Sequence, residues 1–157
     1  MPMTDLPVDE LSWGVLSNAV GPRARLLRNL LRMRASMVSE PYGLPAGSLT
    51  VLSLVSANQG CSPSALADRS GLFKANVVGI VNELEERSLV QRIRSDQDRR
   101  YKAVSLTEQG RELMEALNAE MATIEASIQE EFGLQEMAQF TEYLDRAIAA
   151  LTKHSAK

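Results

Sequence analysis

The sequence predicts a mainly α-helical fold with one small β-hairpin. Apolar residues recur at helical spacing through most of the 157 residues, as in amphipathic helices. Between residues 89 and 106 the period changes, and two short β-capable runs flank a polar turn. Single glycines and prolines separate these segments, so we expect a series of short, connected elements.

The N-terminal part is predicted to hold two helices. The first covers residues 9–39, and Gly21 and Pro22 are expected to break or kink it. Its apolar stripe has steps of four, three and four: Leu26, Leu30, Met33 and Met37. Pro45 is expected to open the next helix, whose apolar residues are Leu49, Leu52 and Val55.

Two short helices and the hairpin form the predicted middle of the chain. Ser62 followed by Pro63 is a strong helix start. The serine oxygen can accept a hydrogen bond from a backbone N–H of the first turn that has no partner within the helix, and proline fixes φ near its helical value. This helix should reach Ser70. A second helix over residues 73–87 carries its apolar face at Val77, Ile80, Val81 and Leu84. The hairpin strands are predicted at residues 89–94 and 101–106.

Two more helices are predicted after the hairpin. Thr107 is a good N-cap for the first, which should bury Leu113, Leu117, Met121, Ile124 and Ile128. The second runs over residues 134–151, with the stripe Met137, Phe140, Leu144, Ile148 and Leu151. Terminal helices this apolar need a surface to pack on, and a second copy of the chain is the simplest one. We therefore expect dimerisation regions at residues 1–44 and 107–157, around a central region at 45–106, all in one structural domain.

Charge is distributed unevenly along the chain. The net charge is −3, yet residues 62–106 hold eight Lys or Arg against six Asp or Glu, whereas residues 107–151 hold two against ten. An anion-binding surface is therefore expected in the middle region.

Several classes of protein are not expected. A single cysteine, Cys61, cannot form an internal disulfide, and with His154 as the one histidine a His or Cys metal cluster is not expected. The sequence holds no catalytic triad, phosphate-binding loop or dinucleotide fingerprint, so neither enzyme activity nor a cofactor is expected. No apolar run is long enough to span a membrane, and we expect a cytoplasmic protein.

The middle helices have the spacing of a helix-turn-helix. Ala67, Gly71 and Val77 lie four and then six residues apart. Ala67 allows the helices to approach, Gly71 allows a turn with positive φ, and Val77 fills the angle between them. Because the predicted hairpin follows these two helices in the sequence, the pattern predicts a winged helix-turn-helix.

In that fold the second helix enters the major groove of DNA. Asn76 could pair with an adenine, Lys74 with guanine or phosphate, and Val78 with a thymine methyl group. The arginines at the tip of the hairpin could enter the minor groove. The candidate DNA-contacting residues are Ser62, Ser64, Lys74, Ala75, Asn76, Val78, Gly79, Arg99 and Arg100. The alternatives are a solvated helix face and a soluble turn with local ion pairs.

Four runs carry a resemblance to the MarR family of transcriptional regulators: SPSALA at 62–67, LEERSLV at 84–90, DQDRR at 96–100 and VSLTEQG at 104–110. The resemblance covers nearly the whole chain. It implies a homodimer joined by its N- and C-terminal helices, which binds inverted-repeat DNA and is often released by a small aromatic effector.

The chain departs from the family pattern at three places. Val78-Gly79 stands where members usually carry Thr-Arg, Asn82-Glu83 where they carry Asp-Arg, and Ser88 where they carry glycine. The first two changes remove groups that would bind bases and phosphates. The alternative to a repressor is therefore a winged-helix protein-interaction module with weak or no DNA binding.

Three smaller features remain open. Met33 and Met37 with Trp13 could line a ligand cavity or pack in the core. Cys61 could sense redox state or be a plain loop residue. A basic segment could pair with the acidic C-terminal helices of a partner, which we favour, or touch phosphate: Arg23, Arg25, Arg28, Arg32 and Arg34.

Overall fold

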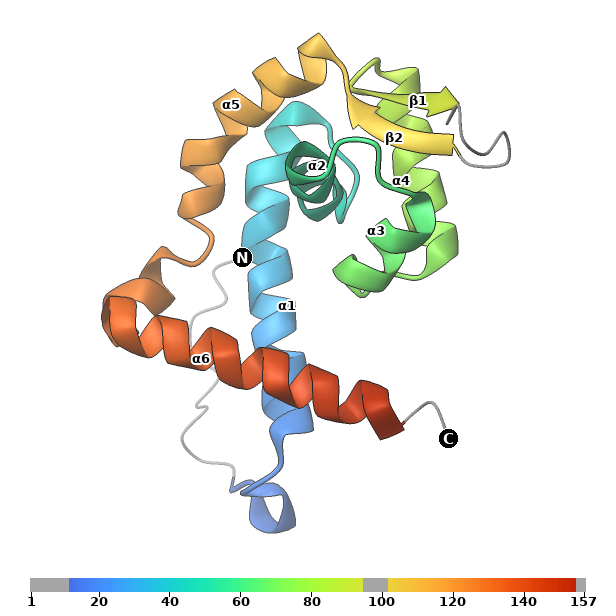
Figure 1. The fold of residues 1–157 in the computed structure, drawn as a ribbon. Coiled ribbons are helices and arrows are strands. Elements are labelled where there is room, and N and C mark those ends of the chain that lie inside the picture. Colours follow the sequence, from blue (N-terminus) through green and yellow to red (C-terminus); the bar gives the residue numbers. More distant parts are fainter. Residues whose placement is uncertain (1–11, 95–101, 155–157) are drawn as a thin grey trace.

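A computed structural model describes residues 12–94 and 102–154 of the chain (Figure 1). The described residues form helices and one two-stranded antiparallel sheet, so the predicted mainly α fold with a hairpin is confirmed. In chain order the elements are η1 Gly14–Leu16, α1 Val20–Ser39, η2 Glu40–Tyr42, α2 Ser48–Ala57, α3 Pro63–Ser70, α4 Lys74–Glu86, β1 Val90–Arg94, β2 Lys102–Leu106, α5 Glu108–Ala122 and α6 Ala126–His154.

The first long helix starts later than predicted. Helix α1 begins at Val20, so Gly21 and Pro22 lie in its first turn and do not interrupt it. The reason is that a first-turn amide has no partner within the helix, and the proline ring therefore costs no hydrogen bond there. The predicted end of this helix at Ser39 is confirmed.

Helix α2 also begins later than predicted, at Ser48 and not at Pro45. The cap residue Gly47 has a φ of 90°, in the left-handed region that favours glycine. A Cβ there would lie 3.2 Å from methyl carbons of both Leu72 and Ile80. A sharp turn at Gly47 therefore separates the proline from the helix.

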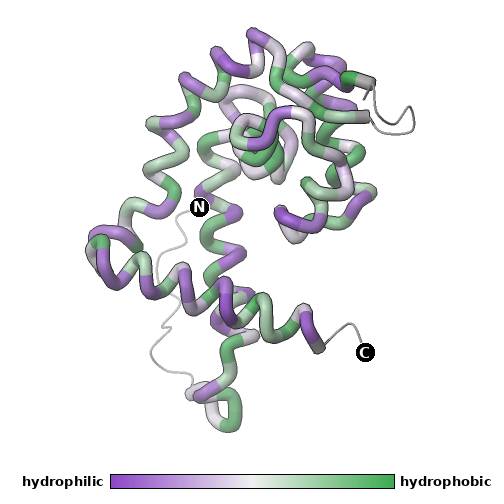
Figure 2. The backbone as a smooth tube through the Cα atoms, in the orientation of Figure 1, coloured by the Kyte–Doolittle hydropathy of each residue, from purple (hydrophilic) through white to green (hydrophobic). Residues whose placement is uncertain are grey.

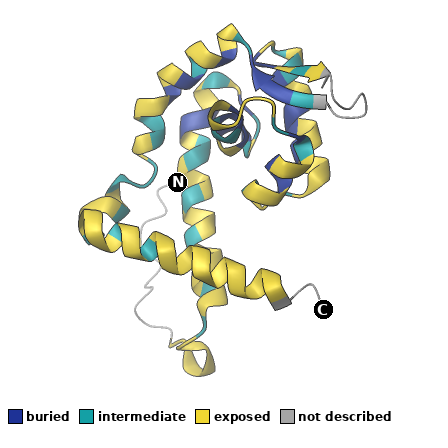
Figure 3. Cartoon of the chain, viewed as in Figure 1, coloured by how far each residue is buried: buried dark blue, intermediate teal, exposed yellow. Residues whose placement is uncertain are grey.

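The core lies between α2, α3, α4, the hairpin and the first half of α5. In Figure 3 the buried residues gather there, whereas α6 is exposed along most of its length. From α1 only the C-terminal end contributes a buried apolar side chain, that of Val38. The fully buried apolar residues are Leu52, Leu84, Leu106, Leu117, Val51, Val55, Val77, Val81, Val90 and Val104.

The hairpin pairs residue for residue from Val90 with Leu106 to Arg94 with Lys102. Cys61 adds a bridge to Val104 on the other side of β2, through the hydrogen bond from Val104 N to Cys61 O at 2.8 Å. The loop before α3 is therefore tied to the wing by backbone hydrogen bonds.

Helix α4 ends in a Schellman motif that has a serine where glycine is preferred. Ser88 N donates to Glu85 O and Leu89 N to Leu84 O, both at 2.9 Å. Ser88 has a φ of 57°, which is unfavourable for a residue with a Cβ. The serine at this position therefore adds strain but leaves the turn formed.

We expect Ser88→Gly to raise the free energy of unfolding by about 1 kcal/mol, because glycine adopts the left-handed conformation without steric cost. Urea denaturation would measure the change. Ser56→Gly is the control, because Ser56 lies exposed in α2 with helical backbone, and glycine should lower stability there. A lower urea midpoint for Ser88→Gly than for wild type would contradict the assignment of backbone strain to Ser88.

Two side-chain contacts tie η2 to the rest of the molecule. The Arg87 guanidinium donates to the carbonyl oxygens of Tyr42 and Gly43, each at 2.7 Å. Tyr42 Oη donates to Glu120 Oε1 on α5 at 2.5 Å, and this hydrogen bond raises the pKa of Tyr42. The connection between α1 and α2 is thus held from both α4 and α5.

The C-terminal helices divide differently from the prediction. Helix α5 ends at Ala122, so Ile124 lies in a turn and Ile128 on α6, although both were expected on one helix with Leu113. The backbone of α6 breaks at Gly133, where φ is 68° and ψ is 175°, and the straight part begins beyond it, near the predicted start. No helix among the described residues is both long enough and apolar enough to cross a membrane.

Candidate nucleic-acid interface

The first helix of the candidate reading unit begins as the sequence predicts. Ser62 Oγ accepts from Ala65 N at 2.9 Å, and Pro63 is the first residue of α3. Helix α3 ends at Ser70, and the following Gly71, with a φ of 68°, provides the left-handed turn. These local signals place α4 at an angle to α3.

Small and branched side chains set how closely α3 and α4 pack. Ala67 is 3% exposed and Val77 is fully buried, and both belong to the core. The steric roles predicted for Ala67, Gly71 and Val77 are therefore confirmed. One face of α4 is fixed in the core by Val77, Ile80, Val81 and Leu84.

The opposite face of α4 is exposed over its first two turns. It carries short side chains next to one cation, and the exposed residues are Lys74, Ala75, Asn76, Val78 and Gly79. Phe73 stands before the helix, makes no side-chain cap and is 82% exposed. A convex helix face with so few long side chains can approach another surface closely.

The other predicted contact residues have different surroundings. Ser62 is 8% exposed and its Oγ serves the helix cap, whereas Ser64 is exposed on the first turn of α3. Of the two serines, Ser64 is thus the accessible one. Arg99 and Arg100 lie outside the described residues.

A hydrogen-bonded cluster that the sequence analysis missed joins the wing to α4. The Arg92 guanidinium on β1 forms an ion pair with the Glu85 carboxylate and donates to Asn82 Oδ1 at 2.6 Å. The Arg92 backbone N–H also donates to Glu85 Oε1 at 3.2 Å. The periodicity of α4 indicates only that Glu85 is off the core face, and nothing local predicts a partner seven residues away. We call Asn82, Glu85 and Arg92 the latch.

The charge on the exposed face of α4 changes from positive to negative along the helix. Lys74 lies at the N-terminal end, where the helix dipole is also positive. Glu83 and Glu86 are exposed near the C-terminal end. An anionic partner is therefore favoured at the first half of the helix and repelled at the second.

Cys61 has the surroundings of a structural cysteine. Burial raises the pKa of its thiol, and its backbone pairs with Val104. A raised pKa keeps the thiol protonated at neutral pH, which favours the plain loop residue over the redox sensor. Among the described residues no group of three or more His, Cys, Asp or Glu side chains could hold a metal ion.

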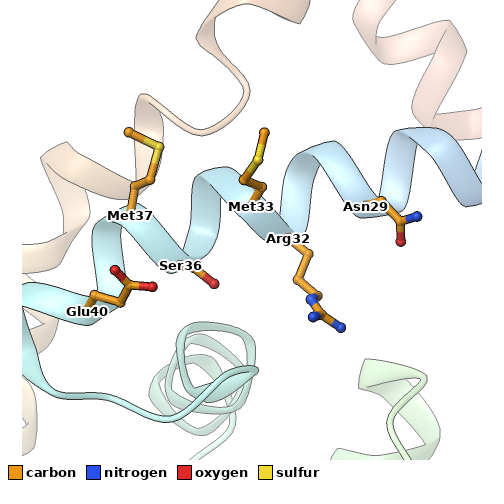
Figure 4. A pocket seen from close by; sticks show the side chains of 6 residues that line it. All are labelled: Asn29, Arg32, Met33, Ser36, Met37 and Glu40. Carbon is orange, nitrogen blue, oxygen red and sulfur yellow. The ribbon is translucent and has the colours of Figure 1, made fainter. Parts of the chain in front are cut away.

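A second candidate site is an open pocket of about 540 Å³ along α1. Met33 and Met37 line it together, but Trp13 does not. Trp13 lies ahead of α1 and stacks on the Arg23 guanidinium, 4.7 Å from the ring centroid, and the ligand-binding role of all three residues stays a prediction. The complete lining is Asn29, Arg32, Met33, Ser36, Met37 and Glu40 (Figure 4).

Comparison with known proteins identifies a family model, a curated protein and solved structures that are similar to this chain. A family model described as MarR family matches residues 42–100. A candidate transcriptional regulatory protein for the hcr operon of Thauera aromatica is 33% identical over 79 residues. That match covers 50% of this chain and 48% of the relative, so it spans about half the length of each.

Solved structures resemble a larger part of the chain. A MarR/EmrR family transcriptional regulator from Acinetobacter sp. ADP1 is 26% identical, with a TM-score of 0.79 over 88% of this chain and 98% of that one. CouR bound to a 23-mer DNA duplex is 27% identical, with a TM-score of 0.71 over 91% and 99%. CouR from Rhodococcus jostii RHA1 bound to p-coumaroyl-CoA is 28% identical, with a TM-score of 0.72 over 82% and 91%.

Proposed function

The chain is similar to MarR family transcriptional regulators, and from this premise we propose that it represses transcription as a homodimer on an inverted-repeat DNA operator. In the proposed complex each α4 enters a major groove, and the two grooves lie about one helical turn of DNA apart. The tip of each hairpin, with Arg99 and Arg100, would reach the neighbouring minor groove.

The exposed first half of α4 is the observation that carries this proposal. Its buried face is rigidly held in the core, while Lys74, Asn76 and Val78 stand outward. These three side chains offer a cation, a bidentate amide and an apolar contact, which are the groups that read base edges. The similarity to CouR, a protein bound to DNA in its own structure, supports the same assignment.

The proposed dimer rests on apolar side chains that the single chain leaves exposed. The terminal regions 1–44 and 107–157 would form the interface. Figure 1 shows α6 crossing the line of α1, and in Figure 2 apolar positions recur along both helices. The exposed large apolar residues are Val20, Leu26, Leu30, Met33 and Met37 on α1, and Leu134, Tyr143, Leu144, Ile148 and Leu151 on α6. Surfaces of this kind usually mark an interface.

An aromatic effector is proposed for the pocket along α1. Met33 and Met37 supply adaptable apolar contacts, and Arg32 supplies a cation. CouR, which is similar over most of this chain, is bound to p-coumaroyl-CoA in one structure, and that supports an aromatic ligand. Occupation of the pocket would change how α1 and the reading unit are placed, and DNA would be released.

A protein-interaction module is the alternative function. The exposed carboxylates Glu83 and Glu86 on α4 favour it, because they repel phosphate. Phe73, at the other end of α4, is 82% exposed and would suit a protein partner as well.

A protection footprint on the DNA upstream of the gene for this chain separates the two functions. We expect two protected half-sites on one face of the duplex, with an affinity that falls as salt rises because counterions are released. Aromatic acids and their thioesters would then be added to test release. Absence of protection at 50 mM salt would favour the interaction module.

We expect Asn76→Ala to relax sequence preference more than it lowers affinity, because a lost bidentate contact to a base costs about 1 to 3 kcal/mol at the operator and nothing on random DNA. Competition between operator and random duplexes, followed by fluorescence anisotropy, measures both. Asn118→Ala is the matched control, an exposed asparagine on α5. If Asn76→Ala keeps the wild-type preference for operator over random DNA, another residue reads the bases.

A further inference from the structure

The residue just before α4 combines high exposure with a missing helix cap. Phe73 is the N-cap residue of this helix, is 82% exposed and makes no side-chain cap hydrogen bond. A serine or aspartate at an N-cap accepts a hydrogen bond from a backbone N–H of the first turn and stabilises the helix. The chain therefore holds a large apolar side chain in water at a position where a small polar one would make the helix more stable.

The backbone before α4 directs Phe73 away from the core. Its neighbour Leu72 packs against the core cluster, with a methyl carbon 3.2 Å from the position that a Cβ on Gly47 would take. Phe73 has extended backbone, with φ of −63° and ψ of 141°, and successive side chains of extended backbone point to opposite sides. Among the described residues no aromatic ring or cation stacks on Phe73. Its ring is thus free to contact another molecule.

The charges around Phe73 favour an anionic molecule. Residues 69–82 hold two cations, Arg69 and Lys74, and no acidic residue. Both cations are exposed, and the positive end of the helix dipole lies at the same place. The first exposed carboxylate of α4, that of Glu83, is about three helical turns further along. This setting favours DNA over the protein partner of the alternative function.

We propose that Phe73 selects thymine in the operator by packing its ring against the C5-methyl group of a thymine base in the major groove. This inference rests on the proposed DNA-binding function. The first residues of a recognition helix are those that reach base edges, and the thymine methyl group is the apolar group displayed there. The thymine read by Phe73 would lie beside the bases contacted by Lys74 and Asn76.

Replacing single thymines by deoxyuridine, which lacks only the C5-methyl group, tests the inference. The full wild-type chain first selects a duplex from a random-sequence pool, and fluorescence anisotropy then measures affinity for each substituted duplex. At one thymine of each half-site we expect the wild-type affinity to fall about fourfold, because one buried carbon of apolar surface contributes roughly that factor. Phe73→Ser should bind the thymine duplex at least about fourfold more weakly and lose less than about twofold on the same replacement.

Two properties of the variants separate a base contact from a loss of fold. Phe73→Ser supplies a polar N-cap, so its urea midpoint should not fall below that of wild type. Phe73→Leu is the matched control, because leucine keeps an apolar side chain at the same position. It should retain most of the preference for thymine over deoxyuridine.

Four outcomes would overturn the inference. Unchanged operator affinity in Phe73→Ser would leave the ring off the duplex and available to a protein partner. Equal losses on deoxyuridine in wild type and Phe73→Ser would assign the methyl group to another residue, such as Val78. No loss at any thymine would show that no methyl group is read. In these three cases the proposed function stands. If the wild type selects no duplex at all, the proposed function fails and the inference fails with it.

Discussion

Gly110→Ala is expected to lower the free energy of unfolding by about 3 kcal/mol or more, at the upper end of what overpacking a core costs. A Cβ at this position would lie 2.0 Å from the carbonyl oxygen of Leu89 and 3.0 Å from its carbonyl carbon. Both are backbone atoms, so the clash cannot be relieved by the rotation of a side chain. The start of α5 would have to move off the start of β1.

The position cannot relax easily, because the same junction is held by hydrogen bonds. Thr107 N donates to Leu89 O at 3.1 Å, and Thr107 Oγ1 donates to Ser88 O at 2.5 Å and accepts from Gly110 N at 3.0 Å. A shift of α5 would therefore break the helix cap as well. Urea denaturation followed by circular dichroism measures the loss.

Gly79→Ala is the matched control, and its expected change in the free energy of unfolding has the opposite sign. Gly79 lies in α4 with helical backbone, and a Cβ there meets nothing within 4 Å. Alanine should raise stability by about 0.5 to 1 kcal/mol because it lowers the entropy of the unfolded chain. Equal midpoints for wild type and Gly110→Ala would refute the close approach at Leu89.

Arg92→Glu is expected to have the second-largest effect, because it places two carboxylates together in the latch. The Arg92 and Glu85 side chains are 19% and 38% exposed, between a surface pair and a buried one. Breaking such a pair should cost about 2 kcal/mol, above the 1 kcal/mol of exposed pairs and below the cost for buried ones. The wing should also lose its fixed angle to α4, and operator affinity should fall.

A double-mutant cycle separates this contact from other effects. The combined variant Glu85→Arg with Arg92→Glu restores opposite charges and should recover at least half of the lost stability. The same cycle at Glu108 and Arg111 is the control, because these side chains are 75% and 51% exposed, and its coupling should stay below about 0.5 kcal/mol. Additive effects at Glu85 and Arg92 would mean that the latch does not couple the wing to α4.

Much of the reading unit could be predicted because its signals are local. The cap at Ser62, the turn at Gly71 and the cap at Thr107 each involve residues no more than four positions apart. The buried face of α4 follows from its period alone. The latch could not be predicted, since Arg92 and Glu85 lie on different elements and meet only after the chain has turned at Ser88.

The terminal helices show the limit of periodicity. Leu26, Leu30, Met33 and Met37 form a regular apolar stripe, yet all four are exposed and α1 buries Val38 instead. A stripe indicates that a face will be covered, but not by which surface. In the same way, the sequence alone does not show that Trp13 stacks on Arg23 and lies outside the pocket lined by Met33 and Met37.

The amino-acid sequence by itself determined the type and order of the elements, the helix-turn-helix with its hairpin, and the resemblance to MarR family regulators. Caps, turns and apolar periods act over a few residues and need no distant partner. Only the tertiary structure decided that Gly110 must lack a side chain and that Arg92 joins the wing to α4. These properties depend on contacts between residues far apart in the chain, which only packing brings together.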